Sequence, residues 1–300
     1  AYYMLQEEYE IVKFYDNNDA KVGTQIDGIP IVKWNGTYDG ILIVIALLQY
    51  EQVVEQLAKC GLRPVTDFTL WKNFYPFEEL SYFDFYKMEI ACGKKIDYQN
   101  FLPKRKLAVV FGNCQTSVLE ELFSYSPDFR KEYAVVYIPR IFEFVYDKEY
   151  ATYFANDTNF WKQVDLFIYQ KVSKSNRFSE LVASDRIMGM LKPSCQKVCI
   201  LNTYFTGYYP QMCKNAGAHL KSVQNSGLFP YGDTVVESYL QKGFSVEEII
   251  QKIQESVVFP EKTIEEGVHQ SFAEMKRREK EADVAISDYI LANYKKKQLF

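Results

Sequence analysis

Residues 107–123, LAVVFGNCQTSVLEELF, are the stretch of sequence that decides the fold. It opens with an unbroken apolar run, a pattern typical of a strand buried on both faces of a parallel sheet. Gly112 and Asn113 interrupt the run, and apolar residues then return at helical spacing. The stretch therefore predicts a strand, a sharp turn and a helix, with Thr116 or Ser117 as the helix N-cap.

Cys114 follows this turn, at or just before the predicted helix N-terminus. Unpaired backbone N–H groups and the positive end of the helix dipole favour an anion there, whether a thiolate, an oxyanion or a phosphate. Gly112 lets the backbone turn sharply or approach a ligand closely, and Asn113 and Gln115 place amide groups on either side of the sulfur. The pattern favours a functional thiol over the ordinary alternative, a small buried apolar residue.

Strand-like runs downstream alternate with helical patterns. They lie at 133–138, 164–169 and 197–201. This order predicts an α/β fold in which helices flank a parallel sheet. Tyr169 and Gln170 end one of these strands and Asn202 follows another, and the carboxyl ends of parallel strands meet at one edge of the sheet. We therefore expect these side chains and the Cys114 turn to share a ligand crevice.

The first part of the chain predicts a smaller α/β module and a linker. Short apolar runs followed by an amphipathic helix at 50–59 make residues 1–70 resemble a Rossmann-like nucleotide-binding module. The strand and glycine-rich loop that open such a module are missing ahead of the first helix. We therefore expect a truncated copy used for packing or partner contacts, with Asp16 as a solvated turn residue. The aromatic stretch 71–104 is expected to be a linker packed between domains.

Composition and charge exclude several classes of function. The formal net charge is −4, and the aromatic residues do not interleave with lysine and arginine clusters, so nothing indicates nucleic-acid binding. No apolar run reaches the length of a membrane span, and the first residues do not resemble a signal peptide. Two histidines and six cysteines without a CxxC pair argue against a metal site and indicate a reduced, cytoplasmic protein. The oligomeric state stays open.

A long amphipathic helix, broken once, is predicted over residues 263–294. Glu279 falls on its apolar stripe, and a buried carboxylate needs a cation or hydrogen-bond donors. Arg278 stands beside it, so the two residues are either a structural ion pair or groups that reach the site. We expect the structural role for Glu279.

Several stretches resemble the WcbI-type capsule polysaccharide acetyltransferase family. They are GNCQ at 112–115, DLFIYQ at 165–170, LNTYFTGYYPQ at 201–211, FPYGD at 229–233 and REKEADVAISDYILANYKKKQLF at 278–300. The resemblance covers roughly residues 105–300. It implies an α/β fold, coenzyme A binding with acetyl-CoA as the donor, and O-acetyl transfer to a hydroxyl of a sugar or polysaccharide precursor.

The candidate site residues follow from the residue pattern together with this resemblance. Cys114 is the expected nucleophile or, alternatively, part of an oxyanion hole, and His269 and His219 are the candidate bases. The resemblance also implies a further histidine-containing segment beyond Phe300, where the family base would lie. The residues expected to bind coenzyme A are Gly112, Asn113, Gln115, Thr116, Ser117, Tyr169, Gln170, Asn202, Tyr204, Gly207, Tyr208 and Arg278.

Two other functions stay open at the level of sequence. A nucleophile at a strand-to-helix turn also suits an α/β esterase-type hydrolase that uses Cys114. The chain could also be an inactive module that binds coenzyme A or a sugar without turnover.

Overall fold

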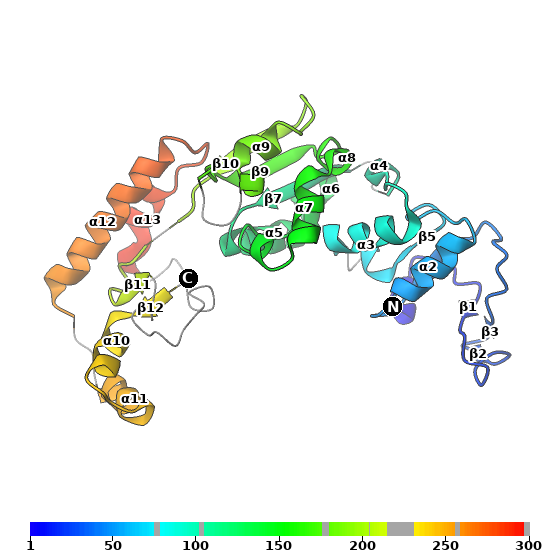
Figure 1. Ribbon diagram of the computed structural model, residues 1–300, viewed down its shortest axis with the longest axis horizontal. Coiled ribbons are helices and arrows are strands. Elements are labelled where there is room, and N and C mark those ends of the chain that lie inside the picture. The colour runs from blue at the N-terminus through cyan, green and yellow to red at the C-terminus, as the bar shows by residue number, and fades with distance from the viewer. Residues whose placement is uncertain are drawn as a thin grey trace. The chain divides into compact units, whose positions relative to one another are not determined.

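The computed structural model describes residues 1–74, 79–101, 105–175, 180–203, 205–214, 231–255 and 259–296. Contacts divide the chain into two compact units, residues 1–200 and 201–300, and Figure 1 labels the elements of each. The domain limits expected at residues 70 and 104 remain predictions.

The first unit is built around a five-stranded sheet in the order β10-β9-β7-β8-β6. All of its strand pairs are parallel, which confirms the α/β fold with a parallel sheet. The strands are β6 (Leu80–Ser81), β7 (Lys106–Phe111), β8 (Tyr133–Tyr137), β9 (Leu166–Gln170) and β10 (Gln196–Ile200). The edge strand β6 comes from the stretch that was expected to be a linker.

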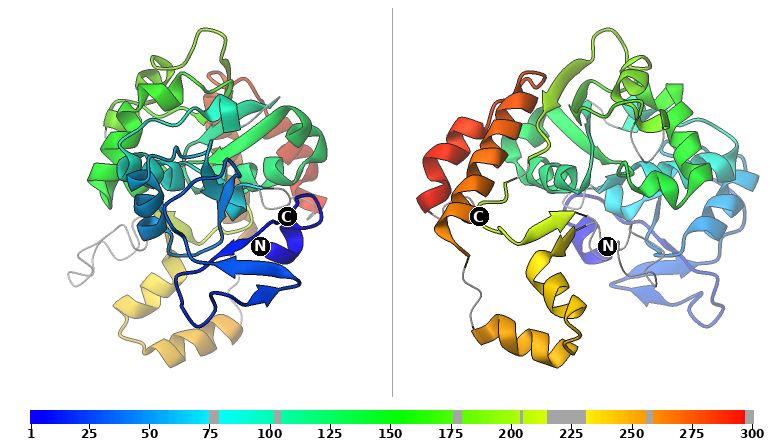
Figure 2. Two further views of the ribbon diagram at one scale, coloured as in Figure 1. Left: turned by 90° about the vertical axis from the view of Figure 1, so that its right-hand side faces the viewer. Right: turned by 60° about the vertical axis from the view of Figure 1, so that its left-hand side comes forward.

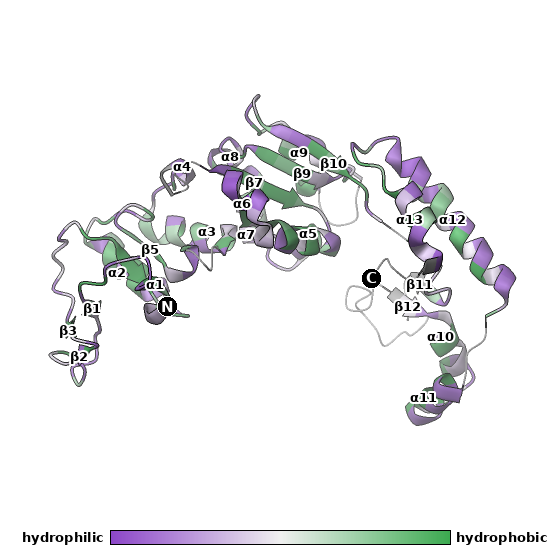
Figure 3. Ribbon diagram, turned by 180° about the vertical axis from the view of Figure 1, so that it is seen from behind, coloured by the Kyte–Doolittle hydropathy of each residue, from purple (hydrophilic) through white to green (hydrophobic). Residues whose placement is uncertain are grey.

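Helices cover both faces of this sheet, which explains the continuous apolar run of β7. Val109 and Phe111 belong to the core on one face, and Ala108 and Val110 to the core on the other. The first face packs against α3 (Tyr82–Cys92), α7 (Lys148–Asn156) and α8 (Thr158–Trp161), and the second against α5 (Cys114–Tyr125) and α6 (Pro127–Glu132). Figure 3 shows β7 and β9 in the green of hydrophobic residues.

The strand connections diverge at β7. From β7 the chain passes through α5 and α6 to β8 on one side of it. From β9, on the other side of β7, the chain passes through η3 (Glu180–Val182) and α9 (Ser184–Met188) to β10, farther out. In open α/β sheets such a switch point opens a ligand crevice at the carboxyl ends of the two strands. The loops after β7 and β9 therefore mark the place to look for a site.

A smaller α/β region precedes this sheet. β1 pairs parallel with β3, β2 pairs antiparallel with β3, and β4 and β5 form a separate parallel pair. The elements are α1 (Tyr2–Leu5), β1 (Phe14–Tyr15), β2 (Gln25–Ile26), β3 (Ile29–Val32), β4 (Ile43–Ile45), α2 (Glu51–Lys59), β5 (Phe68–Leu70) and η1 (Trp71–Asn73). The helices α4 (Tyr98–Phe101) and η2 (Glu143–Val145) complete the first unit. That the region is a truncated Rossmann-like module stays a prediction.

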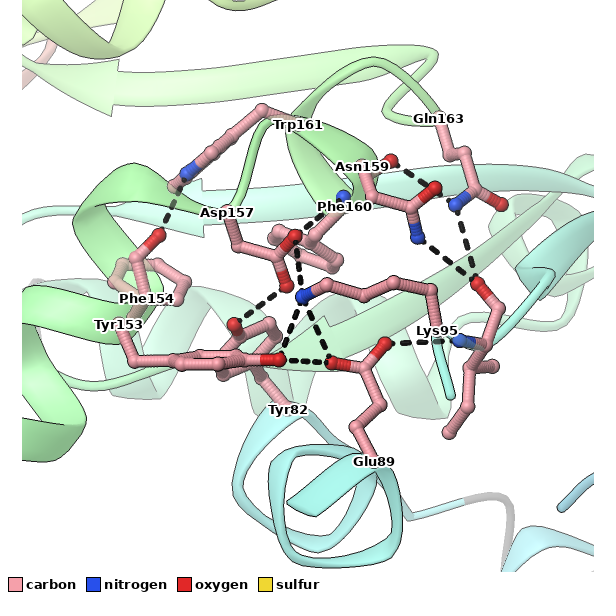
Figure 4. A network of polar contacts seen from close by, with 11 residues as sticks. Tyr82, Glu89, Lys95, Tyr153, Phe154, Asp157, Asn159, Phe160, Trp161 and Gln163 are labelled. Carbon is pink, nitrogen blue, oxygen red and sulfur yellow. Dashed lines mark hydrogen bonds and ion pairs between the residues drawn. The ribbon is translucent and has the colours of Figure 1, made fainter. Parts of the chain in front are cut away.

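A network of charges joins α3 to α7 and α8 (Figure 4). Lys95 Nζ lies 3.1 Å from Glu89 Oε2 and 3.0 Å from Asp157 Oδ1, and it donates to Tyr153 Oη at 2.6 Å. Glu89 and Asp157 are only 3% and 4% exposed. Burial alone would lower the pKa of Lys95, but its hydrogen bonds with Tyr153, Asp157 and Glu89 raise it above the ordinary value. One cation therefore serves two buried carboxylates.

The second unit is largely helical. α12 (Glu261–Glu279) and α13 (Ser287–Asn293) lie side by side (Figure 2, right, orange and red) around a core that includes Phe272 and Met275. The helical segment predicted over 263–294, broken once, is thus confirmed. The other elements are β11 (Met212–Lys214), β12 (Tyr231–Asp233), α10 (Thr234–Gln241), α11 (Val246–Glu255) and η4 (Tyr294–Lys296).

Glu279 fixes the break between these two helices. Its carboxylate accepts hydrogen bonds from the backbone N–H groups of Ile286 at 2.7 Å and Ser287 at 2.6 Å, and from the Ser287 hydroxyl at 2.6 Å. Partial burial raises the pKa of Glu279, but these bonds outweigh it and bring the pKa below its ordinary value. Arg278 pairs with Glu274 instead, at 2.7 Å, so the expected Arg278–Glu279 ion pair is wrong.

The described residues were also searched for membrane-spanning helices and for metal-ligand groups. Within them, no helix has both the length and the apolar character that crossing a bilayer requires. The same residues include no group of three or more histidine, cysteine, aspartate or glutamate side chains that could hold a metal ion.

Candidate functional site

The turn between β7 and α5 lies at the switch point of the sheet. α5 begins at Cys114, and Asn113 is its N-cap, because Asn113 Oδ1 accepts the backbone N–H of Gln115 at 2.9 Å. The predicted cap at Thr116 or Ser117 is therefore wrong. The helix starts earlier because Asn113 itself takes the extended conformation that a cap requires.

The Gln170 side chain hydrogen-bonds to this turn from the buried side. Its side chain comes from the end of β9, the neighbouring strand, and the residue is 3% exposed. Oε1 accepts the backbone N–H of Asn113 at 2.9 Å, and Nε2 donates to Gln115 Oε1 at 3.1 Å. The Gln170 carbonyl accepts the Ser184 hydroxyl at 3.2 Å. Both ends of the Gln170 amide are thus engaged with the turn, and its role here is to position that turn.

Gly112 makes this close approach possible. A Cβ atom at Gly112 would lie 2.5 Å from Gln170 Oε1 and 2.7 Å from Thr116 Cγ2, which is closer than real Cβ contacts come. Thr116 is fully buried, and its hydroxyl donates to the Asn113 carbonyl at 2.7 Å. Gly112, Thr116 and Gln170 therefore shape the turn from inside.

Cys114 presents its thiol on the outside of the same turn. The residue is exposed. The backbone N–H groups of Gln115 and Thr116 donate to Asn113 Oδ1 and O at 2.9 and 3.0 Å, whereas the N–H of Cys114 has no acceptor among the described residues. An exposed thiol and an open N–H therefore stand together at the positive end of α5, where negative charge is stabilised.

A buried ion pair behind α5 was missed in the sequence. The Arg140 guanidinium donates to both carboxylate oxygens of Glu120, to the Ile138 carbonyl at 2.9 Å and to Ser117 Oγ at 2.6 Å. Arg140 is 9% exposed and Glu120 fully buried. An arginine just past the carboxyl end of β8 was the available signal, because that edge is where ligand-site residues gather. The contact with Ser117 ties the first turns of α5 to the loop after β8.

The Glu120 carboxyl group makes stability depend on pH. Burial raises its pKa to about 7, although the hydrogen bonds from Arg140 act to lower it. A pKa above that of the unfolded chain stabilises the fold below about pH 4.5, and this contribution is lost as the pH rises through about 7. We expect the free energy of unfolding, measured by urea denaturation, to fall across that window by on the order of 3 kcal/mol.

The Glu120→Gln variant should lose this part of the pH dependence. Glu121→Gln, at an exposed neighbouring position on the same helix, is the matched control and should keep it. Equal pH slopes for Glu120→Gln and the parent would contradict the assignment.

Tyr169 lies on the sheet with its ring stacked on Phe167, 5.1 Å between centroids, and packed against the core. Its place next to Gln170 in sequence therefore does not bring the ring under the Cys114 turn, because neighbouring residues of a strand point to opposite faces.

Other predicted residues come together within the second unit. Arg278 donates to the backbone carbonyl of Asn202 at 3.3 Å. Asn202 Oδ1 is buried and finds no hydrogen-bond partner within the described part of the chain. Tyr208 donates its hydroxyl to the carbonyl of Tyr294. Arg278 lies on α12 and Tyr294 begins η4, so each contact joins the segment after β10 to a C-terminal helix.

The remaining candidates are less informative. A Cβ atom at Gly207 would lie 2.7 Å from Val268 Cγ2, so this glycine serves close packing on α12. His269 is exposed on α12. His219 and Tyr204 lie outside the described residues.

Comparisons with known proteins agree with the α/β fold. A family model described as "Polysaccharide biosynthesis enzyme WcbI" matches residues 107–300. A solved structure of WcbI, described as the native protein without a disulfide bond between coenzyme A and a cysteine, gives a TM-score of 0.50 at 23% identity. The match covers 63% of this chain and 60% of that chain, so less than two thirds of that protein is spanned. No curated protein matches this sequence.

Proposed function

Because this chain belongs to the WcbI family of polysaccharide biosynthesis enzymes, we propose that it is an acyltransferase that moves the acetyl group of acetyl-CoA to a sugar hydroxyl of a surface (capsular) polysaccharide precursor. The observation that carries the proposal is Cys114, an exposed thiol beside its own open N–H at the start of α5. A thioester carbonyl placed there would meet a nucleophile and an oxyanion donor together. Because acetyl-CoA is available in the cytoplasm, the proposed location is the cytoplasm.

Coenzyme A is the proposed donor for two reasons. The WcbI structure is described by reference to a disulfide between coenzyme A and a cysteine, which supports placing the coenzyme A thiol beside a cysteine, and we assign Cys114 to that role here. The Cys114 turn also offers donors: the Cys114 N–H and Asn113 Nδ2 make no hydrogen bond with the residues that the structure describes. Amide donors of this kind suit the carbonyl groups of the pantetheine arm.

The proposed chemistry has two steps. In the first, the Cys114 sulfur attacks the thioester carbon, the oxyanion accepts the Cys114 N–H, and the carbon–sulfur bond to coenzyme A breaks. Coenzyme A leaves as the thiol and takes up the proton that Cys114 gave up. In the second, the sugar oxygen attacks acetyl-Cys114, the ester forms, and the hydroxyl proton returns to the Cys114 sulfur. His269 and His219 remain the proposed candidates for the base that assists this second step.

Release of free coenzyme A tests the proposal. The protein is incubated with acetyl-CoA, with and without oligosaccharide acceptors, and thiol release is followed together with acetylated sugar by mass spectrometry. We expect release that depends on the acceptor. Turnover of p-nitrophenyl acetate without coenzyme A would instead identify a hydrolase, and a thermal shift by coenzyme A without turnover would identify a binding module.

Alkylation kinetics test the setting of Cys114. Cys60 is the matched comparison, because it is also exposed but follows the carboxyl end of α2. The positive end of α5 stabilises the charge on an attacking sulfur, and the negative end of α2 opposes it. We expect Cys114 to react with iodoacetamide at neutral pH about 3- to 30-fold faster than Cys60, as read by peptide mass spectrometry. Equal rates would show that helix position gives the thiol no advantage.

A further inference from the structure

Two hydrogen bonds fasten the loop after β8 to the turn that carries Cys114. The Ile141 N–H donates to the Gly112 carbonyl at 3.1 Å, ahead of the thiol. Arg140 Nε donates to Ser117 Oγ at 2.6 Å, about one helical turn beyond the thiol. The turn is therefore tied to the loop after β8 on both sides of its thiol, and Arg140 makes the contact with α5.

The Arg140 guanidinium is fixed in direction by other partners than Ser117. Its Nη1 and Nη2 groups donate to the two carboxylate oxygens of Glu120, and Nη1 also donates to the Ile138 carbonyl at 2.9 Å. A guanidinium holds its five N–H groups in one rigid plane, so these bonds also set the direction of Nε. Arg140 and Glu120 are both buried. The contact with Ser117 therefore has a defined geometry.

Stability alone does not account for this ion pair. Burial raises the pKa of the Glu120 carboxyl group to about 7 although Arg140 acts to lower it, so removing the charge from water outweighs the attraction between the two groups. Apolar side chains of similar size would hold α5 to β8 about as well. What the ion pair supplies, and apolar side chains do not, is a donor with a fixed direction at Ser117.

We propose that Arg140 is a positioning residue for Cys114, acting through Ser117 on the first turn of α5. By fixing that turn it holds the Cys114 N–H and thiol in the geometry that acyl transfer uses. Ser117 follows Cys114 by three residues, so the two side chains lie on one face of the helix. The inference rests on the proposed role of Cys114 in the transfer. We expect Arg140 to affect the chemical step rather than the binding of acetyl-CoA.

Two variants remove the contact but leave the buried carboxylate its cation. In Arg140→Lys, the ammonium pairs with Glu120 as a point charge and lacks the rigid fork that also reaches Ser117. Ser117→Ala removes the acceptor and does not touch the ion pair. Arg140→Met is the contrasting variant, because it leaves Glu120 buried without its cation.

Ser124→Ala is the matched control. Ser124 is another half-buried serine of α5, and it accepts a hydrogen bond from the Tyr137 hydroxyl on β8 at 3.2 Å. It lies near the carboxyl end of α5, away from Cys114. The control therefore removes a similar contact between the same helix and strand without affecting the first turn.

The alkylation rate of Cys114 relative to Cys60 is the first readout, and it requires no acetyl transfer. We expect Ser117→Ala and Arg140→Lys each to lower this ratio by about threefold or more. Their double variant should lower it no further, because both changes remove one contact. Ser124→Ala should keep the parental ratio. The melting temperatures of the two single variants should stay within about 4 °C of the parent, and Arg140→Met should melt lower than either.

Steady-state transfer is the second readout. Ser117→Ala and Arg140→Lys should lower kcat by about tenfold or more and change KM for acetyl-CoA by less than about threefold. A purely structural Arg140 would instead give losses that follow the melting temperature, with Arg140→Lys restoring what Arg140→Met loses.

Unchanged alkylation ratios in Ser117→Ala and Arg140→Lys would overturn the positioning role, and so would losses that multiply in their double variant. If the parent protein transfers no acetyl group, the proposed function fails, and the alkylation ratios still decide the role of Arg140.

Discussion

The Cys114→Ala variant should lose acetyl transfer by about a thousandfold or more while it still binds coenzyme A. The substitution removes the sulfur that accepts the acetyl group in the proposed first step. It leaves the Cys114 N–H, the Asn113 cap and the Gln170 contacts in place, since none of them involves the thiol. Initial rates of acceptor-dependent coenzyme A release, with calorimetry for coenzyme A binding, measure the two effects separately.

Cys60→Ala removes a thiol that is also exposed but lies outside the turn, and it should transfer at the parental rate. In the parent without an acceptor, mass spectrometry should find an acetyl group on the peptide that contains Cys114. If Cys114→Ala keeps its rate within about tenfold, the acetyl group passes directly from thioester to sugar, and the turn serves only as an oxyanion hole.

The Lys95→Met variant should lose about 1–3 kcal/mol of stability, because the two carboxylates are buried although the Lys95 side chain itself is 47% exposed. Lys95 is the cation that Glu89 and Asp157 share, and its removal leaves two nearly buried carboxylates facing each other without it. An uncompensated buried charge is costly because the desolvation penalty stays while the attraction is gone. Urea denaturation followed by far-ultraviolet circular dichroism measures the loss.

Lys94→Met is the matched control, because Lys94 is an exposed neighbour in the same loop, and it should change stability by about 0.5 kcal/mol or less. Combining Lys95→Met with Asp157→Asn should recover part of the loss, since it removes one of the stranded charges. A loss no larger than that of Lys94→Met would mean that the cluster is solvated and contributes little.

The sequence predicts the parallel sheet well because β7 is buried on both faces, and a buried parallel strand is an unbroken apolar run. The sequence also places Cys114 at the start of a helix, because the apolar pattern changes locally from an unbroken run to helical spacing. It misplaces the cap because Asn113, Thr116 and Ser117 can all cap a helix, and only the backbone conformation chooses among them.

Contacts between residues far apart in the sequence could not be predicted from local sequence patterns. The Arg140–Glu120 pair joins a loop after β8 to the middle of α5, and neither residue carries a local mark of burial. Gln170 was expected at the sheet edge, but its inward direction depends on the missing Cβ of Gly112, in the turn that follows a different strand. Glu279 was expected to need a partner, and that partner lies beyond the helix break.

The hydrogen bonds between Gln170 and the Cys114 turn also affect when this turn can fold during protein synthesis. Gln170 follows the turn by 57 residues, and the Asn113 N–H has its acceptor there. A nascent chain that has released only β7 and α5 from the ribosome therefore carries the thiol on a turn without its underlying support. The turn takes its final form only once β9 has emerged and joined β7. We therefore expect the turn to reach this geometry only after β9 has been synthesised, and not when α5 itself is released.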